Sequence, residues 1–148
     1  MGGIVMESKF NFNSQICTSR EQSERLLALG LKKETADMCW LNHALTEDYK
    51  DWRAIPIFKD WEKWLRGSIP AWSLHRLIEI IPSNIKVEDD SAYLAMNNNI
   101  VTYLYYYEDY AEMSSCIDFY MGKNIYDNLI YCIKWLIKEG RFSKEYIK

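Results

Sequence analysis

The segment from residue 92 to residue 107 most constrains the fold, because its pattern predicts a β-hairpin. Strand-forming residues over 93–96 precede three consecutive asparagines at 97–99, and a second strand-forming run covers 100–107. Asparagine tolerates the positive φ angles that a tight hairpin turn requires. Two strands joined directly by a short turn are antiparallel. The pattern therefore favours an antiparallel sheet over a doubly wound parallel one.

An N-terminal helix is predicted over residues 19–29 by signals at both of its ends. Ser19 and Gln22 have the spacing of a capping box, in which each side chain satisfies a backbone N–H of the first turn. Gly30 can adopt the left-handed conformation that ends many helices, and Leu31 is placed to pack back onto the helix.

Two further helices are predicted by apolar residues that recur on one helical face. One covers residues 74–81 and ends before Pro82, since proline disfavours helical geometry at the preceding residue. The other begins after Asn124, a capping residue, and its apolar positions continue to Ile137, shortly before Gly140.

Other strands and the fold class follow from weaker patterns. Residues 52–58 have β character, although Pro56 confines such a strand to the edge of a sheet or marks the end of the strand. A further strand is predicted near 115–121, and a short helix over 60–66. We therefore expect an α+β fold, in which a small antiparallel sheet packs with three to four helices. The sheet consists of the hairpin at about 92–107 and one or two further strands.

The length of the chain fits one domain. The 148 residues predict a single globular unit over 1–148, in which residues 1–10 form a poorly ordered N-terminal tail. Surface scaling allows about 69% of the unfolded surface to be buried, which is enough for a core without disulfides or metal. An apolar content of 49% excludes an intrinsically disordered chain.

The distribution of charge argues against a nucleic-acid partner. The net charge is −3, and between Lys86 and Lys123 the chain has no Lys or Arg but seven carboxylates. Nucleic-acid binding relies on clustered Lys and Arg. We interpret this stretch as a solvated acidic face, and a site for a basic partner or a cation is the alternative.

Cysteine use and terminal patterns predict a cytoplasmic protein with reduced thiols. The four cysteines form no CxxC pair, and the first six residues lack the features of a secretory signal. No apolar run reaches 18 residues, so we expect no membrane partner. The oligomeric state is left open by the sequence.

The sequence offers little support for catalysis. It contains no phosphate-binding glycine loop, nucleophile elbow or zinc-peptidase motif. His75 and Glu79 are four residues apart, opposite the apolar face of their helix, which predicts an exposed polar pair. Cys39 and His43 have the same spacing and could be metal ligands or a nucleophile with its base, yet structural zinc needs four ligands. We expect no catalytic residues, cofactor or metal.

The tyrosines of the second hairpin strand are the candidate partner-binding residues. Strand alternation places Tyr103, Tyr105 and Tyr107 on one face and their neighbours on the other. If the opposite face packs on the helices, the three rings line an exposed surface suited to stacking against a partner. The alternative is that both faces are covered, or that the rings only stabilise the sheet.

Three groups of segments together carry a family resemblance. They are 19–31 with 34–38, 69–74 with 77–79 and Pro82, and 126–130 with 135–137. In this combination the chain resembles small uncharacterised proteins carried by prophages and mobile elements of gut-type bacteria. The resemblance covers most of the chain and is weakest over 40–68. It implies an intracellular accessory protein of phage or mobile-element origin, and it implies no catalytic or binding residues.

Two functions are compatible with these patterns. The first is a non-enzymatic accessory protein that acts through contacts with another protein. The alternative is a small-molecule or sugar-binding protein, or a weak enzyme, that uses Trp72, His75 and the acidic residues Glu88, Asp89 and Asp90. The alternative predicts a concave pocket that joins those residues.

Overall fold

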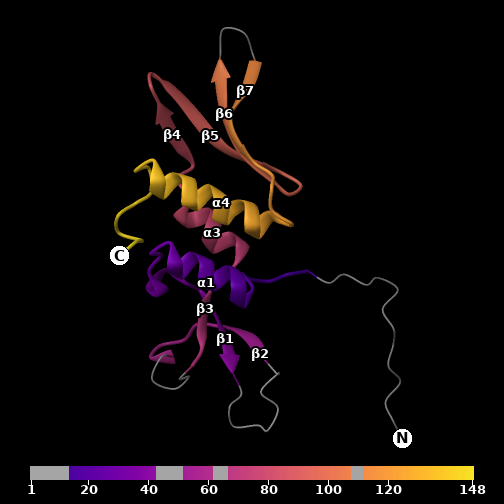
Figure 1. Ribbon diagram of the computed structural model, residues 1–148, viewed down its shortest axis with the longest axis vertical. Helices are drawn as coiled ribbons and strands as arrows, with labels where there is room; N and C mark the ends of the chain where they lie inside the picture. Colours follow the sequence, from indigo (N-terminus) through magenta and orange to yellow (C-terminus); the bar gives the residue numbers. More distant parts are fainter. Residues whose placement is uncertain (1–13, 43–51, 62–66, 108–111) are drawn as a thin grey trace, which may run out of the picture.

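The computed structural model describes residues 14–42, 52–61, 67–107 and 112–148. It has an α+β fold, and three α-helices within the described residues lie between two antiparallel sheets (Figure 1). In chain order the elements are α1 (Arg20–Ala28), the 3-10 helix η1 (Lys33–Thr35), β1 (Met38–Asn42), β2 (Trp52–Pro56), β3 (Ile69–Ala71), α3 (Leu74–Ile80), β4 (Asn84–Val87), β5 (Asp90–Asn97), β6 (Ile100–Tyr107), β7 (Glu112–Phe119) and α4 (Ile125–Lys138).

The larger sheet has the strand order β4–β5–β6–β7 and contains the predicted hairpin. β5 and β6 pair in an antiparallel register, and Asn98 in their turn has a φ of 54°, which lies in the left-handed region. β7 pairs with β6, and its register shifts between the partners of Tyr103 and Leu104, which marks a bulge. The predicted hairpin and third strand are thus confirmed.

The smaller sheet has the order β2–β1–β3 and differs from the sequence prediction. β2 lies at an edge and ends at Pro56, as predicted. The expectation of a single sheet was wrong, because β1 pairs with both β2 and β3 and forms a second one. β3 spans only three residues, too few for alternation to be recognised in the sequence. Most of the helix predicted over 60–66 lies outside the described residues.

The helix ends follow the capping signals. Gln22 N donates to Ser19 Oγ at 3.1 Å, and Ser19 N donates to Gln22 Oε1 at 2.9 Å, so the capping box of α1 is complete. Gly30 has a φ of 96°, and Leu31 N donates to Leu26 O at 3.1 Å. These bonds satisfy backbone groups that a helix end otherwise leaves unpaired.

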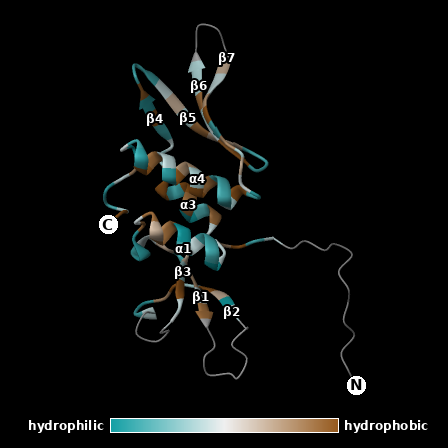
Figure 2. Cartoon of the chain, viewed as in Figure 1, coloured by the Kyte–Doolittle hydropathy of each residue, from teal (hydrophilic) through white to brown (hydrophobic). Residues whose placement is uncertain are grey.

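One hydrophobic cluster joins the described helices with the larger sheet. α4 packs against β6 and β7 and buries Leu129, Ile133 and Leu136, which lie on one face of the helix. The apolar positions of α3 and α4 are visible at the centre of Figure 2. Trp72 is fully buried in the same cluster, and its Nε1 donates to Thr35 Oγ1 at 2.9 Å. The tail predicted over 1–10 lies outside the described residues.

Candidate functional site

Tyr103 and Tyr105 lie on the face of the larger sheet that packs against the core. Tyr103 is fully buried, and its ring centroid lies 6.3 Å from that of Trp135 on α4. Its hydroxyl donates to Pro82 O at 2.7 Å, and burial raises the pKa of the phenol. Tyr105 is partly buried against the same core, and the side chain of Tyr107 lies outside the described residues. The alternation agrees with the sequence pattern, but α4 packs on the Tyr103 face, so the condition for an exposed tyrosine surface, that the opposite face packs on the helices, is not met.

The opposite face of the larger sheet carries the exposed rings. Tyr93 and Tyr106 are each 51% exposed, and Met113, the partner of Tyr106 on β7, is 67% exposed. On the same face, Thr102 and Ser115 lie beside Asp118. The sheet therefore carries exposed aromatic side chains, but the exposed ring on β6 is that of Tyr106, the residue that follows the candidate Tyr105.

The pocket predicted by the alternative function is not formed by its three components. Trp72 lies inside the core, whereas His75 is exposed and pairs with Glu79 at 3.4 Å, which confirms the predicted polar pair. His75 borders a cavity of about 640 Å³ whose other walls are residues 14–16, 73–74 and 124–126. Glu88 and Asp89 form the turn between β4 and β5, Asp90 begins β5, and none of the three lines that cavity.

The buried cysteines are poor nucleophiles at neutral pH. Cys17, Cys39 and Cys132 are fully buried, and desolvation raises the pKa of Cys17 to about 11 and that of Cys132 to about 12. Burial also raises the pKa of Cys39, and His43 lies outside the described residues. A protonated thiol neither attacks an electrophile efficiently nor binds metal. Within the described parts of the chain, no three His, Cys, Asp or Glu side chains gather to hold a metal ion.

An apolar groove of about 340 Å³ lies between α4 and the end of β7, and we call it the α4–β7 groove. Its lining residues are Asp118, Phe119, Tyr120, Met121, Tyr131, Lys134, Trp135 and Lys138. The four residues from α4 follow the spacing i, i+3, i+4 and i+7, so they form one stripe of the helix. This stripe is distinct from the apolar stripe that α4 buries against the sheet.

The groove combines rigid and exposed hydrophobic side chains. Phe119 is buried, and its ring centroid lies 6.0 Å from that of Trp135, which also contacts Tyr103 in the core. Tyr120, Met121 and Tyr131 are 62%, 77% and 38% exposed. Two rings are therefore fixed by the core, and three apolar side chains beside them face solvent.

Charged groups lie on both sides of the groove. Lys134 and Lys138 on α4 are exposed, and neither forms an ion pair with another described residue. Asp118 on β7 accepts hydrogen bonds from Ser115 Oγ at 2.6 Å and Thr102 Oγ1 at 2.5 Å. These two bonds lower the pKa of the Asp118 carboxyl, because they favour its ionised form. The α4 side is therefore cationic, whereas the Asp118 carboxylate is bound to the hydroxyls of Thr102 and Ser115 on the other face of the sheet.

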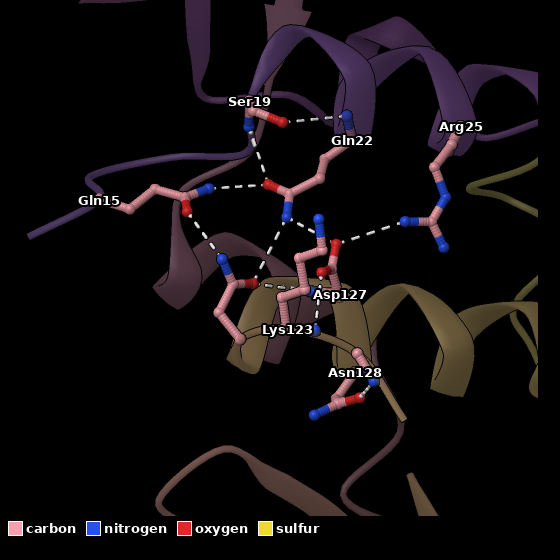
Figure 3. Close-up of polar contacts among 9 residues, drawn as sticks. Gln15, Ser19, Gln22, Arg25, Lys123, Asp127 and Asn128 are labelled. Carbon is pink, nitrogen blue, oxygen red and sulfur yellow. Dashed lines mark hydrogen bonds and ion pairs between the residues drawn. The ribbon is translucent and has the colours of Figure 1, made fainter. Parts of the chain in front are cut away.

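A polar cluster joins the N-terminal ends of α1 and α4 beside the groove (Figure 3). Gln22 Nε2 donates to Asp127 Oδ1 at 2.8 Å, and Gln15 Nε2 donates to Gln22 Oε1 at 2.7 Å. Arg25 contacts the same carboxylate at 3.3 Å and lies over the ring of Tyr131, 5.2 Å from its centroid. Because the donors to Asp127 come from within the protein, we assign this cluster a structural role.

The loop between β7 and α4 is held tightly against the helix. Asn128 is fully buried; its Oδ1 accepts from Gly122 N at 2.7 Å, and its Nδ2 donates to Asn99 O at 2.5 Å. A Cβ atom at Gly122 would lie 2.4 Å from Asp127 Cβ, so only glycine allows this approach. These contacts fix Tyr120 and Met121 opposite Tyr131.

The pattern-based predictions missed this groove, although the sequence contains one signal for it. Tyr131, Lys134, Trp135 and Lys138 are spaced as a second helical stripe. The residues opposite them could not be identified in this way, because Tyr120 and Met121 reach α4 through a loop whose path depends on Asn128.

Comparisons with other proteins add no family to this description. None of the described helices has the length and apolar character needed to cross a membrane. No protein-family model, curated protein or solved structure matches the chain.

Proposed function

We propose that this chain is a non-enzymatic protein that acts by binding another protein, and that the α4–β7 groove is its main contact site. The observation that carries this proposal is the exposure of Tyr120, Met121 and Tyr131 around a floor of rings fixed by the core. Aromatic residues and Met are enriched at protein interfaces, and a rigid concave floor favours a few anchoring side chains.

The exposed hydrophobic side chains around the groove support a contact surface there. Of the ten large hydrophobic side chains that are exposed among the described residues, Tyr120, Met121 and Tyr131 line the α4–β7 groove, whereas Tyr93, Tyr106 and Met113 lie on the other face of the larger sheet. Single exposed apolar residues are ordinary, whereas a concentration of them marks an interaction site.

The lining of the groove favours a protein partner over a small molecule. Its volume of about 340 Å³ falls within the range of small-molecule pockets, about 300–1,000 Å³, so the lining residues and not the volume distinguish the two kinds of partner. Its charged groups, Asp118, Lys134 and Lys138, come from exposed residues. A small-molecule site usually directs polar groups at its ligand from within the pocket.

The resemblance described above supplies the cellular setting of the proposal. We propose an accessory protein of phage or mobile-element origin that acts in the cytoplasm. The resemblance assigns no partner, so the groove is the part of the proposal that can be tested directly.

Site-specific photo-crosslinking tests the proposed function. The photoreactive residue p-benzoylphenylalanine would replace Tyr120 in the groove or, as a control, Phe58, an exposed aromatic residue outside it. We expect a discrete crosslinked protein from Tyr120 that is lost when Tyr131→Glu is added, and no such product from Phe58. Equal products from both positions, or none from Tyr120, would contradict the proposal. Circular dichroism would show that each variant is folded.

A further inference from the structure

We infer that the occupant of the α4–β7 groove is an acidic peptide segment with an apolar anchor, whose carboxylates pair with Lys134 and Lys138. This inference rests on the proposed function and names the chemistry of the partner. The apolar anchor would contact Tyr131 and Trp135, and the carboxylates would lie along α4.

The arrangement of the two lysines is the first argument. Lys134 and Lys138 are one helical turn apart, so they are separated by about 6 Å along the axis of α4. Both line the groove, both are exposed, and neither is paired with another described residue. A lysine stem can lie along apolar surface while its ammonium group stays in water. The two cations are therefore available to a ligand that already fills the groove.

The other charges around the groove give the ligand an orientation. Arg25, near Tyr131, is already paired with Asp127 and adds little further attraction for an anion. On the β7 side no cation of the described residues lines the groove, and the Asp118 carboxylate is held by Thr102 and Ser115 on the other face of the sheet. The carboxylates of an acidic segment are therefore attracted to the α4 side, and its apolar side chain would face β7.

The charge of the neighbouring sheet argues for a narrow partner over a broad anionic surface. Among the side chains described between residues 87 and 122 there is no Lys or Arg, and the acidic ones are Glu88, Asp89, Asp90 and Asp118. An anionic membrane or a nucleic acid would approach the acidic sheet as well as the groove and would be repelled by it. A single peptide segment can contact the groove alone.

The apolar anchor and the two lysines have different roles, which predict how peptide binding depends on salt and on the peptide's sequence. Ion pairs at an exposed rim contribute little affinity each and are screened by salt, so the apolar anchor supplies most of the binding. The lysines supply the preference for acidic over basic segments, because charge complementarity mainly sets specificity.

Two defined peptides test this inference. The acidic probe is a fluorescein-labelled decapeptide with a central Phe-Leu pair flanked by four Glu on each side, and the basic probe has Lys in place of Glu. Binding is measured by fluorescence anisotropy at low and high salt. The site is identified by ¹⁹F NMR of protein labelled with 5-fluorotryptophan, in which Trp135→Phe assigns the Trp135 signal.

We expect the acidic probe to bind more tightly than the basic probe and to shift the Trp135 signal. The double variant Lys134→Glu/Lys138→Glu is expected to weaken the acidic probe by about tenfold or more and to favour the basic probe. The control, Lys86→Glu/Lys144→Glu, makes the same change in net charge at exposed lysines outside the groove and should leave the preference intact. Lys134→Gln/Lys138→Gln replaces the charge-reversal variant if that variant is unfolded.

Other outcomes would overturn the inference, and they separate it from the proposed function. If both probes bind equally and both shift the Trp135 signal, the groove binds peptides without a preference for acidic ones. If neither probe binds but Tyr120 still gives its crosslink, the protein partner has a different chemistry. Binding to phosphatidylserine vesicles that depends on the two lysines would identify a lipid surface in place of a peptide. Failure of both the probes and the crosslink contradicts both proposals.

Discussion

Individual residues at the β7–α4 junction hold the loop that follows Tyr120 and Met121 in the groove. Asn128 joins three segments, because its side chain binds the backbone of Gly122 in one loop and of Asn99 in another. Buried polar groups of this kind are costly when one partner is removed. The residues that line the groove depend on this buried amide, which lies outside the lining itself.

Replacing Gly122 with alanine should destabilise the protein and disturb the groove. The new Cβ atom would lie 2.4 Å from Asp127 Cβ and 2.7 Å from Asn128 Oδ1, so the loop must move. We expect a loss of about 1–3 kcal/mol, measured by urea unfolding. Ser114→Ala, at an exposed position of β7, is the control and should change stability by less than about 0.5 kcal/mol. Equal stability of Gly122→Ala and wild type would show that the loop is not held as described.

Thiol labelling should distinguish Cys116 from the other cysteines. Cys116 is half-buried, whereas Cys17, Cys39 and Cys132 are fully buried. In the folded protein we expect an aromatic disulfide reagent to modify one thiol quickly, and Cys116→Ala to abolish that phase. All four thiols should react after denaturation. Rapid modification of two or more thiols in the folded protein would contradict this burial.

At the scale of helices and strands, the features that could be predicted are the helix ends and the hairpin turn, because local sequence signals determine them. Ser19, Gly30, Asn124 and Pro82 act within one helical turn, so the ends of α1, α3 and α4 could be predicted. The Asn-rich turn between β5 and β6 is equally local. The smaller sheet could not be predicted, because β1 pairs with strands at different distances along the chain and β3 has only three residues.

The face of β6 that becomes covered could not be predicted for a similar reason. Alternation along β6 separates Tyr103 from Tyr106 correctly, but it does not indicate which face α4 will cover. In the structure, Trp135 of α4 lies against Tyr103, and the face of Tyr106 stays open. The candidate groove depends on the same packing of α4 against the sheet. Only the stripe of groove residues on α4 could therefore have been recognised in the sequence.

The contact between α1 and α4 should make Gln22 more important than its neighbours on α1. Gln22 completes the capping box and also donates to Asp127 Oδ1 at 2.8 Å. We expect Gln22→Ala to lower the free energy of unfolding by about 1–3 kcal/mol, because a largely buried carboxylate loses a donor. Glu24→Ala, on the exposed side of the same helix, is the matched control and should have little effect. Similar losses for both variants in urea unfolding would assign the effect to helix propensity.

For the molecule as a whole, the buried thiols predict that the free energy of unfolding decreases at alkaline pH. Desolvation raises the pKa of Cys17 from 9.0 to about 11 and that of Cys132 from 9.0 to about 12. Above pH 9 the unfolded chain releases these protons while the folded protein retains them. The unfolded state then binds fewer protons, so the free energy of unfolding decreases as the pH rises from 9 towards 12.

Cys17→Ala/Cys132→Ala should make this decrease shallower, even if the variant is less stable at every pH. The comparison is the change in the free energy of unfolding between pH 8 and pH 10.5, measured by urea denaturation in each protein. Cys116→Ala is the control, since Cys116 is only half-buried. An unchanged slope in the double variant would show that these two thiols do not cause the alkaline loss.

The bonds that join α1 to α4 also affect how the protein is made. Gln22 and Asp127 are 105 residues apart in the chain. The hydrogen bond between them can therefore form only after all of the intervening chain has left the ribosome. The groove itself requires Lys138, which follows Asp127 in the chain. The proposed binding surface is thus completed only after the helices and strands that precede α4 have been synthesised. A nascent or shortened chain that stops before α4 would lack this binding surface. Only copies of the protein in which α4 has been synthesised could therefore bind the partner through the groove.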